Sequence, residues 1–167
     1  DISAVLSNVG NTAIINPTVT VKVTVDETGQ QVQKDELAVK TEMSFDGTRS
    51  ALSLDKNDIP YVIDNQNGKI YQWVGGEERL YASLDRATTI QHMTFDPAGN
   101  LLAIDAYGYV YVIKPDASFN KVKLVTPFYN IMGITAKAEG QWYITGRTNT
   151  SEHVLVYRDK QGQETIV

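Results

Sequence analysis

Residues 93–105 read MTFDPAGNLLAID, and residues 52–64 read LSLDKNDIPYVID. The two stretches match at an offset of 41 residues, so that Asp64, at the end of one, aligns with Asp105, at the end of the other. In both, a short apolar strand is followed by a polar turn and then by a second apolar strand. Self-similarity at a fixed period of this length indicates a repeat architecture.

The repeat continues on both sides of these stretches. A glycine and an alternating apolar strand follow each of them, GKIYQW from Gly68 and GYVYVI from Gly108. The same template fits residues 134–145, ITAKAEGQWYIT, and more weakly the start of the chain around Leu6, with extra residues in the linker Gln33 to Phe45. Alternation with a period of two, rich in β-branched and aromatic residues, predicts four short strands in each repeat.

A four-stranded unit of about 41 residues is typical of a β-propeller blade. Residues 95–113, FDPAGNLLAIDAYGYVYVI, resemble blades of the NHL and SMP-30/gluconolactonase-like six-bladed superfamily. The resemblance implies an all-β, propeller-like fold. We find no convincing helix, because residues 77–87, EERLYASLDRA, fit a turn and a strand equally well. We expect about four antiparallel, four-stranded blades, over residues 1–44, 45–85, 86–126 and 127–167.

The apolar positions that recur from repeat to repeat are expected to form the core between neighbouring blades. They are Leu54, Phe95, Ile104, Val110 and Val112, with Tyr71 or Trp73 buried in part.

The first segment and the number of blades leave alternatives open. Residues 1–44 also resemble a piece of a bacterial immunoglobulin-like surface module, in which case the blades occupy residues 45–167. The superfamily normally closes with six or more blades, and no Cys is present to lock a four-bladed ring. The chain is therefore an arc of a larger propeller, a part that a second copy completes, or a four-bladed ring. Because the first residue is Asp1, we expect a processed chain or a piece of a longer one.

The composition excludes several classes of protein. The 167 residues are 42 % hydrophobic and 21 % charged, as expected for one globular domain rather than a disordered segment. A net charge of -5 argues against a broad basic surface for nucleic acid. The lack of Cys excludes disulfides and thiolate metal sites, and no apolar run approaches the roughly 20 residues that span a bilayer.

The acidic residues of the repeat have two interpretations. Asp64 and Asp105 could form a ring of carboxylates that binds Ca²⁺ or acts in acid–base catalysis. Their repetition favours the other interpretation, in which each Asp accepts hydrogen bonds from its own turn. Asp55 and Asp96 are expected to start turns in the same way.

No catalytic or metal-binding residue is assigned from the sequence. The nucleophile elbow G-x-S-x-G and the phosphate-loop spacing are absent, and the two histidines, His92 and His153, fall in different kinds of strand. The lactonases of the resembled superfamily bind a metal through an acidic residue near the first strand, and no Glu lies on the corresponding strands here. We therefore expect no cofactor, with Ca²⁺ the one ion kept open.

Polar residues of the inner strands and aromatic residues of the loops are the candidates for binding a partner, together with two arginines. The set is Arg49, Gln91, His92, Tyr107, Tyr129, Asn130 and Arg147. An aromatic side chain on a loop offers a rigid contact for a protein or a sugar.

These residues favour a non-enzymatic recognition or assembly scaffold that presents propeller-face loops to a protein or glycan. A metal-dependent hydrolase or lyase of the SMP-30-like type, and a structural component of a phage or surface particle, remain alternatives. The expected partners also include a second copy of the chain or the rest of a larger propeller, with no nucleic acid and no membrane span. The expected location is secreted, periplasmic or at the cell surface.

Overall fold

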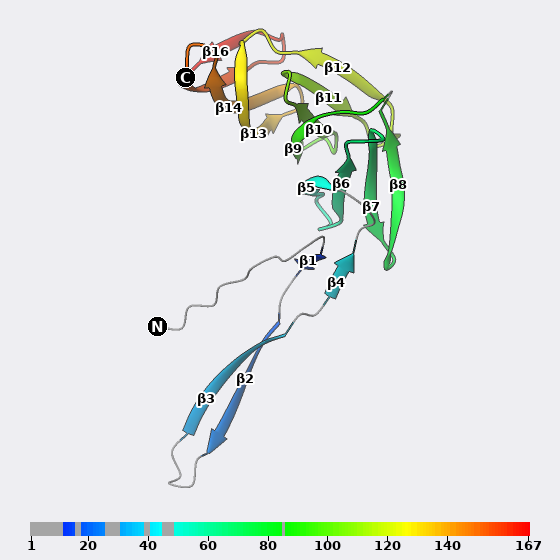
Figure 1. Cartoon of the computed structure of the whole chain (residues 1–167), viewed down its shortest axis with the longest axis vertical. Coiled ribbons are helices and arrows are strands. Elements are labelled where there is room, and N and C mark those ends of the chain that lie inside the picture. The colour runs from blue at the N-terminus through cyan, green and yellow to red at the C-terminus, as the bar shows by residue number, and fades with distance from the viewer. Residues whose placement is uncertain (1–11, 16–17, 26–30, 39–40, 45–48, 85) are drawn as a thin grey trace. The chain divides into compact units, whose positions relative to one another are not determined.

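Figure 1 shows a computed structural model of the chain, which describes residues 12–15, 18–25, 31–38, 41–44, 49–84 and 86–167. The chain divides into two compact units, Asp1–Gly47 and Thr48–Val167. Every regular element in the described residues is a β-strand, so the expectation of an all-β fold without helices is confirmed. It follows that these residues contain no helix long and apolar enough to cross a membrane.

The first unit contains two pairs of strands. β1 (Thr12–Ile15) pairs with β4 (Thr41–Ser44), and β2 (Thr18–Val25) pairs with β3 (Gln31–Ala38), both antiparallel. A blade would join β1 to β2 instead, so the described residues of this segment do not show the strand order of a blade. The expected strand over residues 2–6 lies outside the described residues, and the immunoglobulin-like alternative stays a prediction.

The prediction that Gln33 to Phe45 form a linker was wrong. Most of it belongs to β3 and β4. The physical reason is the long alternation of residues 18–25, which pairs over its whole length with an equally long partner strand instead of ending after a few residues.

The second unit consists of three four-stranded sheets, each antiparallel and each connected in chain order. The first sheet contains β5 (Ser50–Leu54), β6 (Pro60–Asp64), β7 (Lys69–Val74) and β8 (Glu77–Ser83). The second contains β9 (Ile90–Phe95), β10 (Leu101–Asp105), β11 (Tyr109–Ile113) and β12 (Phe119–Lys123). The third contains β13 (Phe128–Ala138), β14 (Gln141–Thr148), β15 (His153–Arg158) and β16 (Glu164–Ile166). These are the strands that the three later repeats predict.

The second sheet is packed between the other two, and its inner strand β9 contacts both β5 and β13. Leu101 and Ala103 face the first sheet, in a core that includes Ile63. Leu102 and Ile104 face the third sheet, in a core that includes Ile144 and Trp142. All five residues of β10 are therefore buried, which is typical of a strand covered on both faces.

Most of the expected core is confirmed, with one exception. Ile104 and Val110 are fully buried, and Phe95 and Val112 are partly buried against the two cores. Leu54 is 44 % exposed, so its expected burial was wrong. It is the last residue of an inner strand and lines an open cleft, so no neighbouring sheet covers it.

The turn interpretation of the recurring Asp residues is confirmed. Asp105 Oδ1 accepts hydrogen bonds from the backbone N–H groups of Tyr107 and Tyr109, at 2.9 and 2.8 Å. Asp64 Oδ1 accepts from the N–H groups of Gln66 and Asn67 in its own turn, at 3.0 and 3.3 Å. Asp55 and Asp96 serve their turns in the same way. The repeated carboxylates thus fix the backbone where each strand ends.

The packing predicts unequal effects of truncation at two of the expected core positions. Ile104→Ala should lower the free energy of unfolding by about 2–5 kcal/mol, because it opens a cavity between the second and third sheets. Leu54→Ala should lower it by less than about 1 kcal/mol, because that side chain is half exposed. Urea unfolding of both variants provides the test, and equal losses would contradict the stacking described here.

Candidate functional site

The third sheet extends beyond the repeat at one end. Asp105 pairs with Ile90 at the end of the second sheet, and Gly146 pairs with Ile131 at the matching place in the third. There the strands continue, since β13 begins at Phe128 and β14 ends at Thr148. We call residues 128–130 and 147–148 the β13–β14 extension.

A glycine in place of the recurring Asp permits this extension. A Cβ atom at Gly146 would lie 2.5 Å from the carbonyl oxygen of Asn130 and 2.7 Å from the ring of Phe128. These distances are too short for any side chain, so the close approach of the two strands requires glycine.

Three of the sequence-predicted residues lie together on this extension. Asn130 pairs in register with Arg147, and Tyr129 lies beside them. All three side chains are exposed, Tyr129 to 77 %. The Arg147 guanidinium donates a hydrogen bond to the carbonyl oxygen of Ser151 at 3.2 Å, which leaves further donors open to a partner.

The loop that leads into β13 is held in place. The carboxylate of Glu164 accepts hydrogen bonds from the N–H groups of Val125 and Thr126, at 2.8 and 2.7 Å, and from the Thr126 hydroxyl at 2.7 Å. The N–H of Asn149 donates to the carbonyl oxygen of Pro127. Val125 is nevertheless 79 % exposed, so an apolar side chain stands in solvent on a fixed backbone.

Tyr107, in the turn between β10 and β11, belongs to the same end of the sheets. It is 69 % exposed, and Lys123 donates to its carbonyl oxygen. The backbone of Leu124, next to Val125, donates to the carbonyl oxygen of Gly108 at 2.9 Å. The turn of Tyr107 and the loop of Val125 are thereby tied together.

His92 and Gln91 lie on the inner strand β9. The Nε2 atom of His92 is 3.3 Å from the carbonyl oxygen of Ile131, so this partly buried side chain links β9 to β13 next to Asn130. Gln91 is exposed. Among the described residues, no group of three or more His, Asp or Glu side chains is placed to hold a metal ion.

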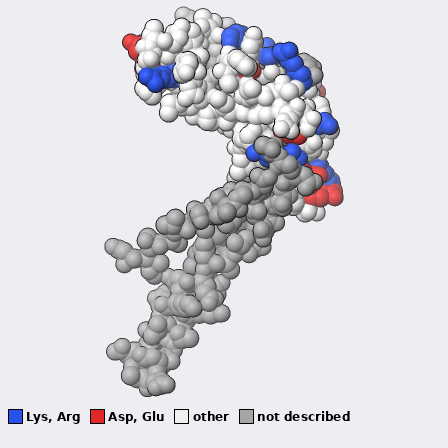
Figure 2. Space-filling view, in the orientation of Figure 1, with Lys and Arg blue, Asp and Glu red and all other residues white. Residues whose placement is uncertain are grey.

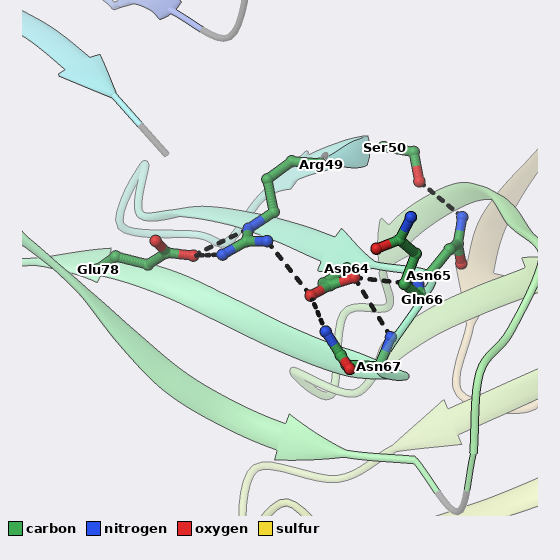
Figure 3. Close-up of polar contacts among 7 residues, drawn as sticks. All are labelled: Arg49, Ser50, Asp64, Asn65, Gln66, Asn67 and Glu78. Atoms are coloured by element: carbon green, nitrogen blue, oxygen red, sulfur yellow. Dashed lines mark hydrogen bonds and ion pairs between the residues drawn. The ribbon is translucent and has the colours of Figure 1, made fainter. Parts of the chain in front are cut away.

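Arg49 belongs to a different cluster, in the first sheet (Figure 3). Its guanidinium donates twice to Glu78 Oε1, at 3.0 and 2.7 Å, and lies 3.4 Å from Asp64 Oδ2. It also covers the ring of Tyr71 at 4.5 Å. These side chains are largely buried, so Arg49 neutralises carboxylates of its own sheet, and its role in binding a partner stays a prediction.

Asn65, which follows Asp64, connects the first two sheets and was not anticipated from the sequence. Its amide accepts a hydrogen bond from the N–H of Ile90 at 2.9 Å and donates to the carbonyl oxygen of the same residue at 3.0 Å. It also donates to the Ser50 hydroxyl, as Figure 3 shows. The one signal in the sequence is a departure from the repeat, because Ala106 occupies the matching position in the second sheet.

Charged side chains of both signs are spread over the face of the described residues in Figure 2, and basic atoms gather near β11 and β12. Lys121 and Lys123 of β12 lie over the ring of Tyr109, at 4.0 and 4.5 Å. These cations therefore contact aromatic rings of their own sheet.

No protein-family model matches the chain, and no curated protein does. Solved structures do match. The chain is similar to virginiamycin B lyase from Staphylococcus aureus, with a TM-score of 0.59 and 14% identity over 88% of the chain and 48% of the lyase. It is similar to YCF48 bound to a D1 peptide, with a TM-score of 0.59 and 11% identity over 87% of the chain and 49% of YCF48. It is also similar to the hydrazine synthase of Kuenenia stuttgartiensis, with a TM-score of 0.56 and 12% identity over 88% of the chain and 43% of the synthase.

The chain has a β-propeller fold. At these identities the similarity concerns the fold alone, and the chain spans about half the length of the structures that it matches. Each of the three four-stranded sheets is a blade, and the extension and its neighbouring loops lie at one end of the blades.

The Asp64 cluster predicts a pH-dependent contribution to the stability of the first blade. The side-chain hydrogen bond from Asn67 holds the pKa of Asp64 below its usual value, with help from two backbone N–H groups and Arg49, although burial acts in the opposite direction. The pKa of Asp64 is therefore lower in the folded chain than in the unfolded chain, where it is about 3.9. The stabilisation by Asp64 is complete at pH values above the unfolded-state pKa, and it is lost as the pH falls through the folded-state pKa.

Asp64→Asn should therefore make the loss of stability on acidification below about pH 4 shallower than in the parent chain. Urea unfolding at a series of pH values measures this slope. An unchanged slope in the variant would show that Asp64 does not contribute to it.

Proposed function

We propose that this chain is a non-enzymatic recognition module of the β-propeller type, which binds a protein partner through the β13–β14 extension and the adjoining loops. One observation carries the proposal. Three large side chains, Tyr107, Val125 and Tyr129, are between 69 % and 79 % exposed at one end of the blades, and hydrogen bonds hold the backbones of Tyr107 and Val125.

Such side chains are suited to recognition for a physical reason. A tyrosine on a fixed backbone buries a large area on binding and loses little conformational freedom. Asn130 and Arg147 supply hydrogen-bond donors beside it, and Tyr and Arg are enriched in protein interfaces.

The structure of YCF48 bound to a D1 peptide supports a protein partner, because it shows that a protein of similar fold binds a peptide. The placement in the NHL and SMP-30-like branch, a glycan or a second copy as partner, and a secreted, periplasmic or surface location are finer parts of this proposal that rest on the sequence. The hydrolase or lyase alternative rests on the names of similar enzymes, and no feature of the described residues favours it or the particle-component alternative.

The test is a selection of peptides from a random displayed library on the immobilised chain, followed by measurement of their affinity for variants. Tyr129→Ala and Arg147→Ala should each lower the affinity of the chain for the selected peptides by about tenfold or more, as expected for residues at the centre of an interface.

Leu80→Ala is the matched control, because Leu80 is 53 % exposed but lies on β8 of the first blade. Its affinity for the selected peptides should equal that of the parent chain. If Leu80→Ala weakens binding while the two variants of the extension do not, the proposed surface is the wrong one.

A further inference from the structure

A concave surface lies at the end of the blades opposite the β13–β14 extension, where β5 and β9 lead into their turns. It is a cleft of about 820 Å³ between the first and second blades, and it reaches Ala136 of the third. Volumes of roughly 300–1,000 Å³ are usual for sites that hold an organic ligand or a few peptide residues. None of the residues predicted from the sequence to bind a partner lines it.

The wall of the cleft is a fixed aromatic cluster. The ring of Tyr61 packs edge-on against Tyr81 and against Phe95, with both pairs of centroids 4.9 Å apart. The Tyr81 hydroxyl donates to the carbonyl oxygen of Lys114 in the second blade at 2.9 Å. Leu54 and Pro115 also line the cleft, so apolar side chains stand beside the polar groups of its wall.

Two polar groups at this wall have unused hydrogen-bonding capacity. Tyr61 is only 6 % exposed, and its hydroxyl has no hydrogen-bond partner among the described residues. Asp55 uses Oδ1 for the N–H groups of its own turn, at 2.8 and 2.9 Å, and its Oδ2 accepts no hydrogen bond within the described part of the chain. Both residues line the cleft. The hydroxyl oxygen of Tyr61 is not sealed from solvent, so a ligand in the cleft can reach it.

The electrostatics identify the kind of group that fits. Burial, followed by the charge of Asp55, raises the pKa of Tyr61 to about 12, so the carboxylate lies within electrostatic reach of this hydroxyl. Asp96, the other carboxylate of the lining, is already paired through both oxygens with Asn100. Lys56 also lines the cleft, and its exposed ammonium group acts against a cationic ligand, so the match depends on direct contact with Asp55. A ligand that donates hydrogen bonds and carries positive charge therefore matches the free acceptors.

We propose that this cleft binds an arginine side chain within a short peptide segment. The guanidinium is planar, weakly hydrated and rich in donors, so it pairs with Asp55 Oδ2 and the Tyr61 oxygen while it stacks on aromatic rings. Its aliphatic stem and the flanking residues cover Leu54, Phe95 and Pro115. This site is separate from the extension at the other end of the blades and does not depend on the function proposed above.

The experiment titrates the full chain with three blocked tripeptides, acetyl-Ala-Arg-Ala-amide and its citrulline and glutamate counterparts, by calorimetry. Citrulline has the shape of arginine without its charge and should bind about tenfold more weakly. Agmatine, which has the guanidinium and stem of arginine but an ammonium group in place of the peptide, should also bind more weakly than the tripeptide, since it lacks the flanking residues that cover the rest of the cleft.

Two conservative variants locate the binding. Asp55→Asn keeps the Oδ1 acceptor of the turn but removes the charge, so it should lower the affinity for the arginine peptide about tenfold. Tyr61→Phe removes only the hydroxyl and should weaken it about fivefold. Leu155→Ala, at a 41 % exposed position in the third blade, is the control and should bind like the parent chain. Melting temperatures verify that each variant is folded.

Several results would overturn the proposal. They are equal binding of the arginine and citrulline peptides, a preference for glutamate, agmatine as tight as the tripeptide, no binding at millimolar peptide, or unchanged affinity in Asp55→Asn. Because Tyr129→Ala alters only the other end of the blades, failure of the surface proposed there leaves these titrations unaffected.

Discussion

The burial of the second blade on both of its faces is the constraint on which the rest of this structure depends. Leu101 and Leu102, adjacent in β10, are both fully buried, the first against one neighbouring blade and the second against the other. A slip of one residue would exchange the two faces, so the register of the whole sheet is fixed. The fixed register in turn places every turn at one of two ends, and both proposed surfaces lie at these ends.

The third blade has a different outer face. Its positions Tyr143 and Thr145 match Leu102 and Ile104 of the second blade, so aliphatic side chains are replaced by hydroxyl-bearing ones. Tyr143 packs against Tyr157 with centroids 5.1 Å apart, and the Tyr157 hydroxyl donates to Gln141 at 2.7 Å. This face of the third blade therefore differs in side-chain chemistry from the matching face of the second blade, although Leu155, opposite Thr145, keeps an apolar side chain on it.

The blades could be predicted from the sequence because their information is local. Period-two alternation defines each strand, and each Asp defines the turn in which it accepts hydrogen bonds, so β9, β10 and β11 begin and end where the pattern indicates. The partners of Arg49 and Asn65 lie between 15 and 29 residues away, and no spacing rule identifies them. The exposure of Leu54 and the free hydroxyl of Tyr61 depend on the shape of a cleft between blades, which a single repeat does not contain. In the described residues of the first unit, β1 pairs with β4 and β2 pairs with β3, an order that the blade repeat does not predict.

The positions that departed from the repeat are also the informative ones for function. Where Asp105 closes the second blade with a turn, Gly146 has no side chain, and the third blade continues into the extension that carries Tyr129 and Arg147. At the other end Asp96 is saturated by Asn100, whereas Asp55 keeps one oxygen without a partner among the described residues. A repeat that satisfies all of its own polar groups has little left with which to bind anything else. Both proposed binding surfaces lie where the repeat leaves an acceptor, a donor or an apolar side chain unused.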